Sequence, residues 1–140
     1  LPSLTEPLSD KSFAFYLEDK SEDSYITIPG FDTERHTAED FTFHNVVEEK
    51  YWALQITSVS RDGKTTDASQ YKAVIDSGTS VLVGPKSLVG PLIEGITVNQ
   101  DCSGTESLPD ITFTIDHIDY VLKQEDYVLR ITQGDDTECV

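Results

Sequence analysis

The stretch Val74-Ile75-Asp76-Ser77-Gly78-Thr79-Ser80 decides how this sequence is interpreted. A carboxyl side chain directly follows a run of apolar residues, and the glycine two positions later permits a tight turn and close approach of another backbone. The hydroxyl groups around it can hydrogen-bond the carboxylate, and burying a carboxylate without such partners is costly. Asp-Ser-Gly alone also fits an ordinary turn in which the aspartate accepts from backbone N–H groups. The longer pattern is far more specific and indicates a polar site at the end of a strand.

Short apolar runs separated by turn residues predict a β-rich fold around this stretch. Residues 13–17 and 25–28 are expected to form a hairpin with a charged tip at residues 18–24. In residues 51–59, Trp52, Leu54 and Ile56 recur at period two, which places them on one face of a strand. The other expected strands are residues 41–47, 73–75, 111–115, 118–122 and 127–129.

Turn and helix signals complete the pattern. Asp62-Gly63 predicts a two-residue type I′ turn, because both central positions need positive φ. A helix is expected after Pro85, and Gly90-Pro91 should shorten or kink it. Its apolar stripe would consist of Leu88, Val89, Leu92 and Ile93. With about eight short strands and one helix, the sequence predicts an all-β or mostly β fold.

Composition excludes several classes of partner. The 140 residues amount to one domain, with 10 Lys and Arg against 26 Asp and Glu and a net charge of -16. The basic residues are scattered singly, so neither nucleic acid nor an anionic membrane surface is an expected partner. No apolar run is long enough to insert into a membrane.

Metal and cofactor chemistry finds no support in the sequence either. No Cys-x-x-Cys motif is present, so neither a zinc site nor a redox motif is expected. The histidines His36, His44 and His117 lack a helical metal-binding spacing, and surface or structural roles are expected for them. Residues 18–24 lack the ladder of alternating ligands ending in Glu that a calcium loop needs. We therefore expect no metal and no cofactor.

Six ordered motifs resemble the C-terminal lobe of pepsin-like aspartic proteases, of the cathepsin D and plasmepsin type. The active-site stretch is one of them, running from Val74 to Gly84-Pro85. The others are Phe13-Ala14-Phe15-Tyr16-Leu17, Ile28-Pro29-Gly30-Phe31-Asp32, Tyr51-Trp52-Ala53-Leu54, Leu108-Pro109-Asp110-Ile111-Thr112-Phe113 and Asp126-Tyr127-Val128-Leu129. Two departures stand out: Ser77 replaces a more frequent Thr, and Pro29 replaces the first Gly of a Gly-Gly-x-Asp motif.

The resemblance implies an endopeptidase in which two aspartates, one from each lobe, activate a water molecule between them. Asp76 would be the aspartate of this lobe. Ser77 would brace the two active-site loops, Gly78 would present backbone groups to substrate, and Thr79 would hydrogen-bond the outer oxygen of Asp76. Ser80 would belong to the same supporting loop. Tyr51 and Val74 match positions that line the substrate cleft, although core packing explains both equally well.

The resemblance also implies partners and a compartment. Cys102 and Cys139, the only cysteines, match a disulfide of that lobe, whereas two free thiols would be expected in a cytosolic protein. The implied partners are a peptide or protein substrate, an N-terminal lobe that supplies the other aspartate, and pepstatin-type inhibitors. The implied location is the secretory pathway, lysosome, vacuole or cell exterior, usually after activation of a zymogen.

Residues 1–140 are expected to be one incomplete lobe. The chain contains no Met, no first Asp-Thr-Gly loop and no flap tyrosine, and it stops before the family's Ile-Leu-Gly-Asp segment and final strands. Alone it would carry half of the catalytic pair and be inactive. Two other hypotheses remain: a catalytically inactive homologue that serves as a binding or inhibitor module, and a retroviral-type homodimer. The homodimer would need an Ile-Ile-Gly or Ile-Leu-Gly after the loop, and none follows Asp76.

Overall fold

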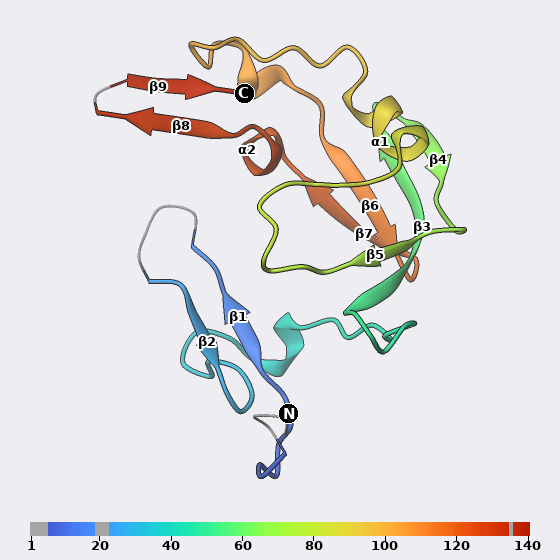
Figure 1. Cartoon of the computed structure of the whole chain (residues 1–140), viewed down its shortest axis with the longest axis vertical. Helices are drawn as coiled ribbons and strands as arrows, with labels where there is room; N and C mark the ends of the chain where they lie inside the picture. Colours follow the sequence, from blue (N-terminus) through green and yellow to red (C-terminus); the bar gives the residue numbers. More distant parts are fainter. Residues whose placement is uncertain (1–5, 19–22, 135) are drawn as a thin grey trace. The chain divides into compact units, whose positions relative to one another are not determined.

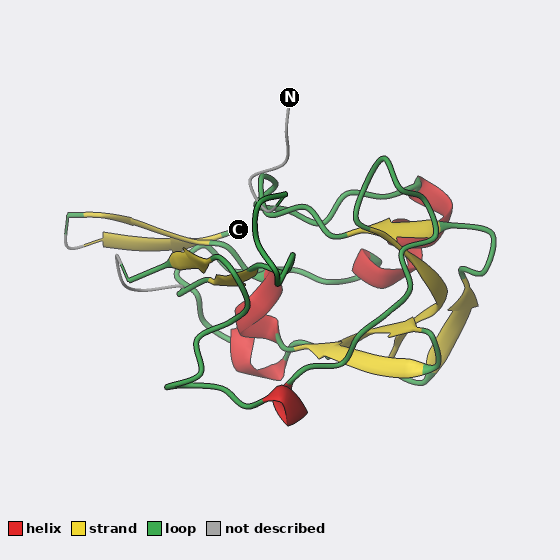
Figure 2. Cartoon of the chain, turned by 90° about the horizontal axis from the view of Figure 1, so that it is seen from below, coloured by secondary structure: helices red, strands yellow, loops and turns green. Residues whose placement is uncertain are grey.

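The computed structural model describes residues 6–18, 23–134 and 136–140, and the chain divides into two compact units, Leu1–Phe43 and His44–Val140. Strands and loops greatly outweigh the short helices in both (Figure 2). This confirms the mostly β fold. Within the described residues, no helix combines the length and apolar character needed to cross a membrane.

The first unit is built on an antiparallel hairpin of β1 (Ala14–Tyr16) and β2 (Tyr25–Thr27), drawn in blue in Figure 1. The hairpin was expected, and most of its tip, residues 19–22, lies outside the described residues. The Tyr16 and Tyr25 rings stack with centroids 5.1 Å apart. A one-turn 3-10 helix, η1 (Ala38–Asp40), follows in the same unit.

The second unit is organised around β3 (Ala53–Arg61), which pairs with three other strands. Along one edge, its first residues pair with β5 (Lys72–Val74) and its last residues pair with β4 (Lys64–Asp67). Along the other edge lies β6 (Ile111–Ile115), which in turn pairs with β7 (Ile118–Leu122) (Figure 1). All of these pairings are antiparallel.

The inward face of β3 differs from the expected one. Buried residues recur every third position, at Ala53, Ile56 and Val59, while Trp52 is mostly exposed. The pairing with β6 shifts register between Ile56 and Ser58, and such a bulge turns the side chains that follow it. The bulge follows Ile56, so it accounts for the burial of Val59 but not for the exposure of Trp52. The period-two prediction is wrong for Trp52, which precedes β3 and whose neighbour Ala53 is buried instead.

One hydrophobic core fills the second unit. Helix α1 (Lys86–Ile93) covers the sheet with Leu88 and Leu92 of the predicted apolar stripe, whereas Ile93, at the end of the helix, is 58% exposed. The helix continues past Gly90-Pro91 instead of ending there, because Gly90 has no Cβ to clash with the proline ring. The buried cluster consists of Ile56, Val59, Ala68, Leu88, Leu92 and Ile111.

Two expected strands are absent. Residues 41–47 form no strand in the described chain; the nearest pairing is an isolated bridge at Glu48, and Phe43 stays 87% exposed without a partner strand to cover it. Instead, the His44 ring bonds the β6–β7 hairpin, with Nδ1 2.9 Å from Asp116 Oδ2 and Nε2 2.6 Å from the Tyr120 hydroxyl.

The second missing strand is residues 127–129. Tyr127 instead ends a helical turn, α2 (Gln124–Tyr127), which the Asp126 carboxylate caps by accepting from the Lys123 N–H at 2.7 Å. Leu129 exchanges two backbone hydrogen bonds with Val140, both 2.9 Å long. A hairpin of β8 (Arg130–Gln133) and β9 (Asp136–Cys139) then follows. Cys139 forms a disulfide with Cys102, which ties β9 to the segment before a second 3-10 turn, η2 (Thr105–Ser107).

The turn between β3 and β4 provides a test of backbone strain. Asp62 and Gly63 both have positive φ, 52° and 72°, as the type I′ turn requires, and no atom crowds a Cβ at position 63. Gly63→Ala should lower the free energy of unfolding by about 1–2 kcal/mol through strain alone. Gly63→Asn should cost less, because Asn tolerates the left-handed region. Urea unfolding measures both, and equal losses would contradict this explanation.

The disulfide provides a test of chain connectivity. It closes a loop with a sequence separation of 37 residues, so removing it should cost about 4 kcal/mol in the chain-entropy treatment. Cys102→Ala, Cys139→Ala and the double variant should lose similar amounts, because each removes the same link. Denaturant unfolding of the three variants checks this, and additive losses would show that packing rather than the link accounts for the effect.

Candidate active site

The stretch that contains Asp76 is placed by the pairing of β5 with β3. Ala53 is paired with Val74, and just beyond the strand the Ile75 N–H donates to the Trp52 carbonyl at 2.9 Å. The chain then leaves the sheet as an exposed loop that ends where α1 begins. Asp76 therefore lies one residue past the last backbone bond of the ladder, directed by the sheet but outside the core.

Both carboxylate oxygens of Asp76 accept hydrogen bonds from its own loop. The Gly78 N–H donates to Oδ1 at 2.9 Å, and the Thr79 hydroxyl donates to Oδ2 at 2.6 Å. A Cβ at position 78 would come 3.2 Å from Oδ1, so a side chain there would require the Asp76 carboxylate to shift by a few tenths of an ångström. The Thr79 hydroxyl, and after it the Gly78 N–H, lower the pKa of Asp76 below its ordinary value, since both favour the charged form.

The two serines of the loop have a different position. Ser77 and Ser80 are exposed, and in the described part of the chain neither hydroxyl bonds the Asp76 carboxylate. The four residues after Asp76 thus divide into two that hold the carboxylate and two that present hydroxyl groups to solvent.

Tyr51 and Val74 lie at the same end of the β3–β5 ladder as Asp76. Continuing the register of Ala53 with Val74 places Tyr51 opposite Asp76. Tyr51 is 60% exposed and Val74 is 50% exposed, so neither belongs to the core of this unit. Of the two explanations left open by the sequence, burial in this chain's core does not apply to either residue.

Large apolar side chains are exposed around the loop. They are Trp52, Ile75, Val81, Leu82 and Val83. Exposed apolar side chains also occur away from the loop, for example Leu17, Phe43 and Leu129, so their exposure alone does not distinguish this loop. The loop is thus a polar carboxylate set among exposed apolar residues.

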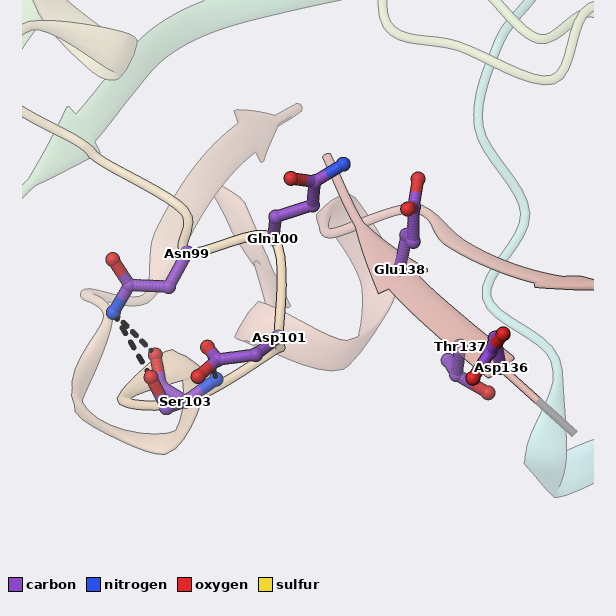
Figure 3. Close-up of a pocket in the computed structure, with 7 residues that line it drawn as sticks. All are labelled: Asn99, Gln100, Asp101, Ser103, Asp136, Thr137 and Glu138. Carbon is purple, nitrogen blue, oxygen red and sulfur yellow. Dashed lines mark hydrogen bonds between the residues drawn. The ribbon is translucent and has the colours of Figure 1, made fainter.

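Two cavities lie elsewhere. One of about 680 Å³ is lined by polar and acidic residues beside the disulfide (Figure 3). They are Asn99, Gln100, Asp101, Ser103, Asp136, Thr137 and Glu138. A second, of about 270 Å³, lies in the Leu1–Phe43 unit. Neither includes a residue of the Asp76 loop, and no group of three His, Cys, Asp or Glu side chains in the described residues could hold a metal ion.

Comparison with known proteins places this geometry in a family. The family described as eukaryotic aspartyl protease matches residues 5–140. The chain belongs to the eukaryotic aspartyl protease family. Its Asp76 loop, disulfide and paired strands are therefore those of a member of this family.

Individual relatives agree with the family match. Pepsin A of Sus scrofa is 32% identical over 94% of this chain, and cathepsin D of Chionodraco hamatus is 33% identical over 91%. A pregnancy-associated glycoprotein of Equus caballus is 35% identical over 88%. The chain spans about a third of the length of these relatives, 36%, 35% and 34% respectively.

Some contacts of this aspartyl protease chain had no sequence signal. The Trp52 carbonyl, which holds Ile75, is a backbone group that any residue could supply. The Gly78 N–H bond to Asp76, by contrast, is of the kind that an Asp-Ser-Gly turn predicts. Only strand pairing, which the sequence does not show directly, brings Trp52 and Ile75 together.

Removing the Thr79 hydroxyl should change the titration of Asp76. Thr79→Val should raise the Asp76 pKa toward its ordinary value, while Thr79→Ser should keep it low because the hydroxyl remains. A depressed folded-state pKa stabilises the fold above the ordinary Asp pKa of about 3.9 and loses that effect as pH falls through the folded value. Thr79→Val should therefore reduce stability at neutral pH more than in strong acid. Carboxyl NMR titration and unfolding at both pH values test this, and identical titrations of the two variants would contradict it.

Proposed function

We propose that the protein containing this chain is an aspartic endopeptidase and that Asp76 is one of its two catalytic carboxyl groups. The observation that supports this is the Asp76 carboxylate, held by donors at both oxygens yet left exposed at the end of a strand. The family match supports the same reaction class.

The reaction requires a second carboxyl group. Two carboxyl groups within a few ångströms cannot both ionise, so they share a proton, and aspartic proteases are the general example. The charged member takes a proton from water, whose oxygen attacks the peptide carbonyl carbon, while the protonated member donates a hydrogen bond to the carbonyl oxygen. We assign residues 1–140 to the C-terminal lobe and the second aspartate to an N-terminal lobe.

The remaining loop residues have supporting roles in this proposal. Thr79 and the Gly78 N–H orient the Asp76 carboxylate, and Ser77 meets the facing loop of the other lobe. Ser80 completes the same loop. Tyr51 and Val74, exposed at the same end of the ladder, form part of the wall that receives a peptide substrate or a pepstatin-type inhibitor.

The disulfide supports a compartment for the protein. A disulfide between Cys102 and Cys139 persists in oxidising surroundings. We therefore place the protein in the secretory pathway, in a lysosome or vacuole, or outside the cell, with activation from a zymogen.

A second candidate is a catalytically inactive homologue that binds peptides or inhibits other proteins. The observation in its favour is that one relative, the pregnancy-associated glycoprotein of Equus caballus, has a name that states no catalytic activity. The intact Asp76 loop favours the enzyme, because the carboxylate and both of its donors are retained.

The test is peptide cleavage by the full-length protein in acid. Asp76→Asn should reduce kcat by about 10²–10⁴-fold, the usual contribution of a general acid or base. Asp136→Asn makes the same chemical change at an exposed position of β9 and should leave cleavage unchanged. Wild-type activity in Asp76→Asn would refute the assignment, and no cleavage by the wild type with retained pepstatin binding would favour the inactive homologue.

A further inference from the structure

A half-buried amide, Gln55, connects the chain segments that meet where β5 begins. Its Nε2 donates to three backbone carbonyls, those of Ile56 at 2.8 Å, Ser69 at 3.0 Å and Tyr71 at 3.1 Å. A carbonyl can only accept a hydrogen bond, so the partners themselves require the NH₂ group on this side. Two N–H bonds serve three acceptors, which means that one of the bonds is shared.

Each of these carbonyls is at a place where regular pairing is interrupted. Ile56 lies at the bulge of β3, where the ladder with β6 shifts register. Ser69 and Tyr71 lie between β4 and β5, outside both strands. The bonds to Ile56 and Tyr71 are partly buried and the bond to Ser69 is exposed, so the donor contributes most at the bulge and at the residue that precedes β5.

The position of Gln55 relates it directly to β5. Gln55 is paired with Lys72, the first residue of β5, while the carbonyls of Ser69 and Tyr71 belong to the residues just before Lys72. β5 has only three residues, so its ladder is short and its placement depends on its two ends. The bond from Ile75 to Trp52 fixes the far end, and the Gln55 amide fixes the near end.

We propose that Gln55 is a positioning residue for Asp76. By holding the start of β5 against β3, its amide sets how far along β3 the strand lies, and hence where the carboxylate four residues after Lys72 is presented. The catalytic part of this inference rests on the proposed function of Asp76. The structural part, that Gln55 fixes the register of β5, stands without it.

Two substitutions at position 55 separate hydrogen bonding from packing. Gln55→Met has a similar length and no donor, so all three carbonyls lose their partner. Gln55→Glu keeps the size of the side chain, and it is the test variant if Gln55→Met does not fold. When ionised, Glu repels the three carbonyls, but below about pH 4.3 it becomes protonated and regains one O–H donor. Lys72, which faces this position, has its ammonium group on Glu48 at 2.9 Å.

Two measurements on the full-length protein compare these variants with the wild type. The first is hydrogen exchange of the Ile75 amide, corrected for intrinsic pH effects, which we expect to be about tenfold faster in Gln55→Met. The second is peptide cleavage, where a shifted carboxylate should lower kcat by about 10- to 100-fold with little change in KM. In Gln55→Glu both defects should be large at neutral pH and diminish as pH falls. Gln133→Met, the same change at an exposed position of β8, should alter neither.

The outcomes distinguish this inference from the proposed function. If Asp76→Asn abolishes cleavage while Gln55→Met keeps wild-type kcat and Ile75 exchange, Gln55 does not position Asp76. If Asp76→Asn cleaves like the wild type, the proposed function is wrong. Hydrogen exchange of the Ile75 amide alone then decides whether Gln55 fixes the register of β5. Fast Ile75 exchange in Gln55→Met with recovery of Gln55→Glu in acid would then support the positioning of β5, and unchanged exchange would overturn it.

Discussion

The pairing of β5 with the first residues of β3 is the interaction on which the candidate site depends. β5 is three residues long, and Asp76 follows it after a single intervening residue. A ladder this short gains little from its own hydrogen bonds, so neighbouring contacts must hold it in register. These neighbouring contacts are the backbone hydrogen bond from Ile75 to Trp52 and the packing of Ala73 and Tyr71 against the core. The loop hydrogen bonds can orient the Asp76 carboxylate only because this ladder first fixes its backbone.

The bulge in β3 connects that ladder to the core. It divides β3 into a part that pairs with β5 and a part that pairs with β4, and both parts direct a residue inward, Ile56 and Val59. Hydroxyl groups cross the bulge to β6: Thr57 Oγ1 donates to the Thr114 carbonyl at 3.1 Å, and the Ser58 hydroxyl donates to Thr114 Oγ1 at 3.0 Å. Thr57 has no paired residue on β6 because of the register shift, and its side chain bonds β6 instead. Polar residues at this buried crossing stabilise a local irregularity that apolar ones could not.

Local signals predicted the parts of the fold that depend on one or two residues. Asp62-Gly63 fixed a turn through the sign of φ, and the Asp76 loop was predicted because an aspartate after an apolar strand needs donors close by. Predictions failed where a distant partner decides. Residues 41–47 were predicted to form a strand but form none in the described chain, although the Val47 N–H donates to the Ala53 carbonyl of β3. After the bulge, which depends on pairing with β6, β3 buries Val59 instead of continuing the predicted alternation. The Gln55 contacts could not be predicted, because all three acceptors are backbone groups.

The contacts within this chain lower the Asp76 pKa, whereas the proposed reaction needs one raised pKa in the catalytic pair. Within this chain, the Thr79 hydroxyl and the Gly78 N–H both favour the charged carboxylate, and they lower its pKa. A carboxyl group that shares a proton with a second one needs the opposite influence on one member of the pair. The described donors in the loop stabilise the anion, and desolvation, which raises the Asp76 pKa, is the smallest of the three influences on it. In the proposed enzyme, the facing carboxylate would therefore have to raise one pKa by like-charge repulsion, and the two groups would titrate as a pair whose values belong to neither alone. In the proposed enzyme, the Asp76 loop orients the carboxylate, and the facing carboxyl group of the other lobe determines how many protons the two groups retain.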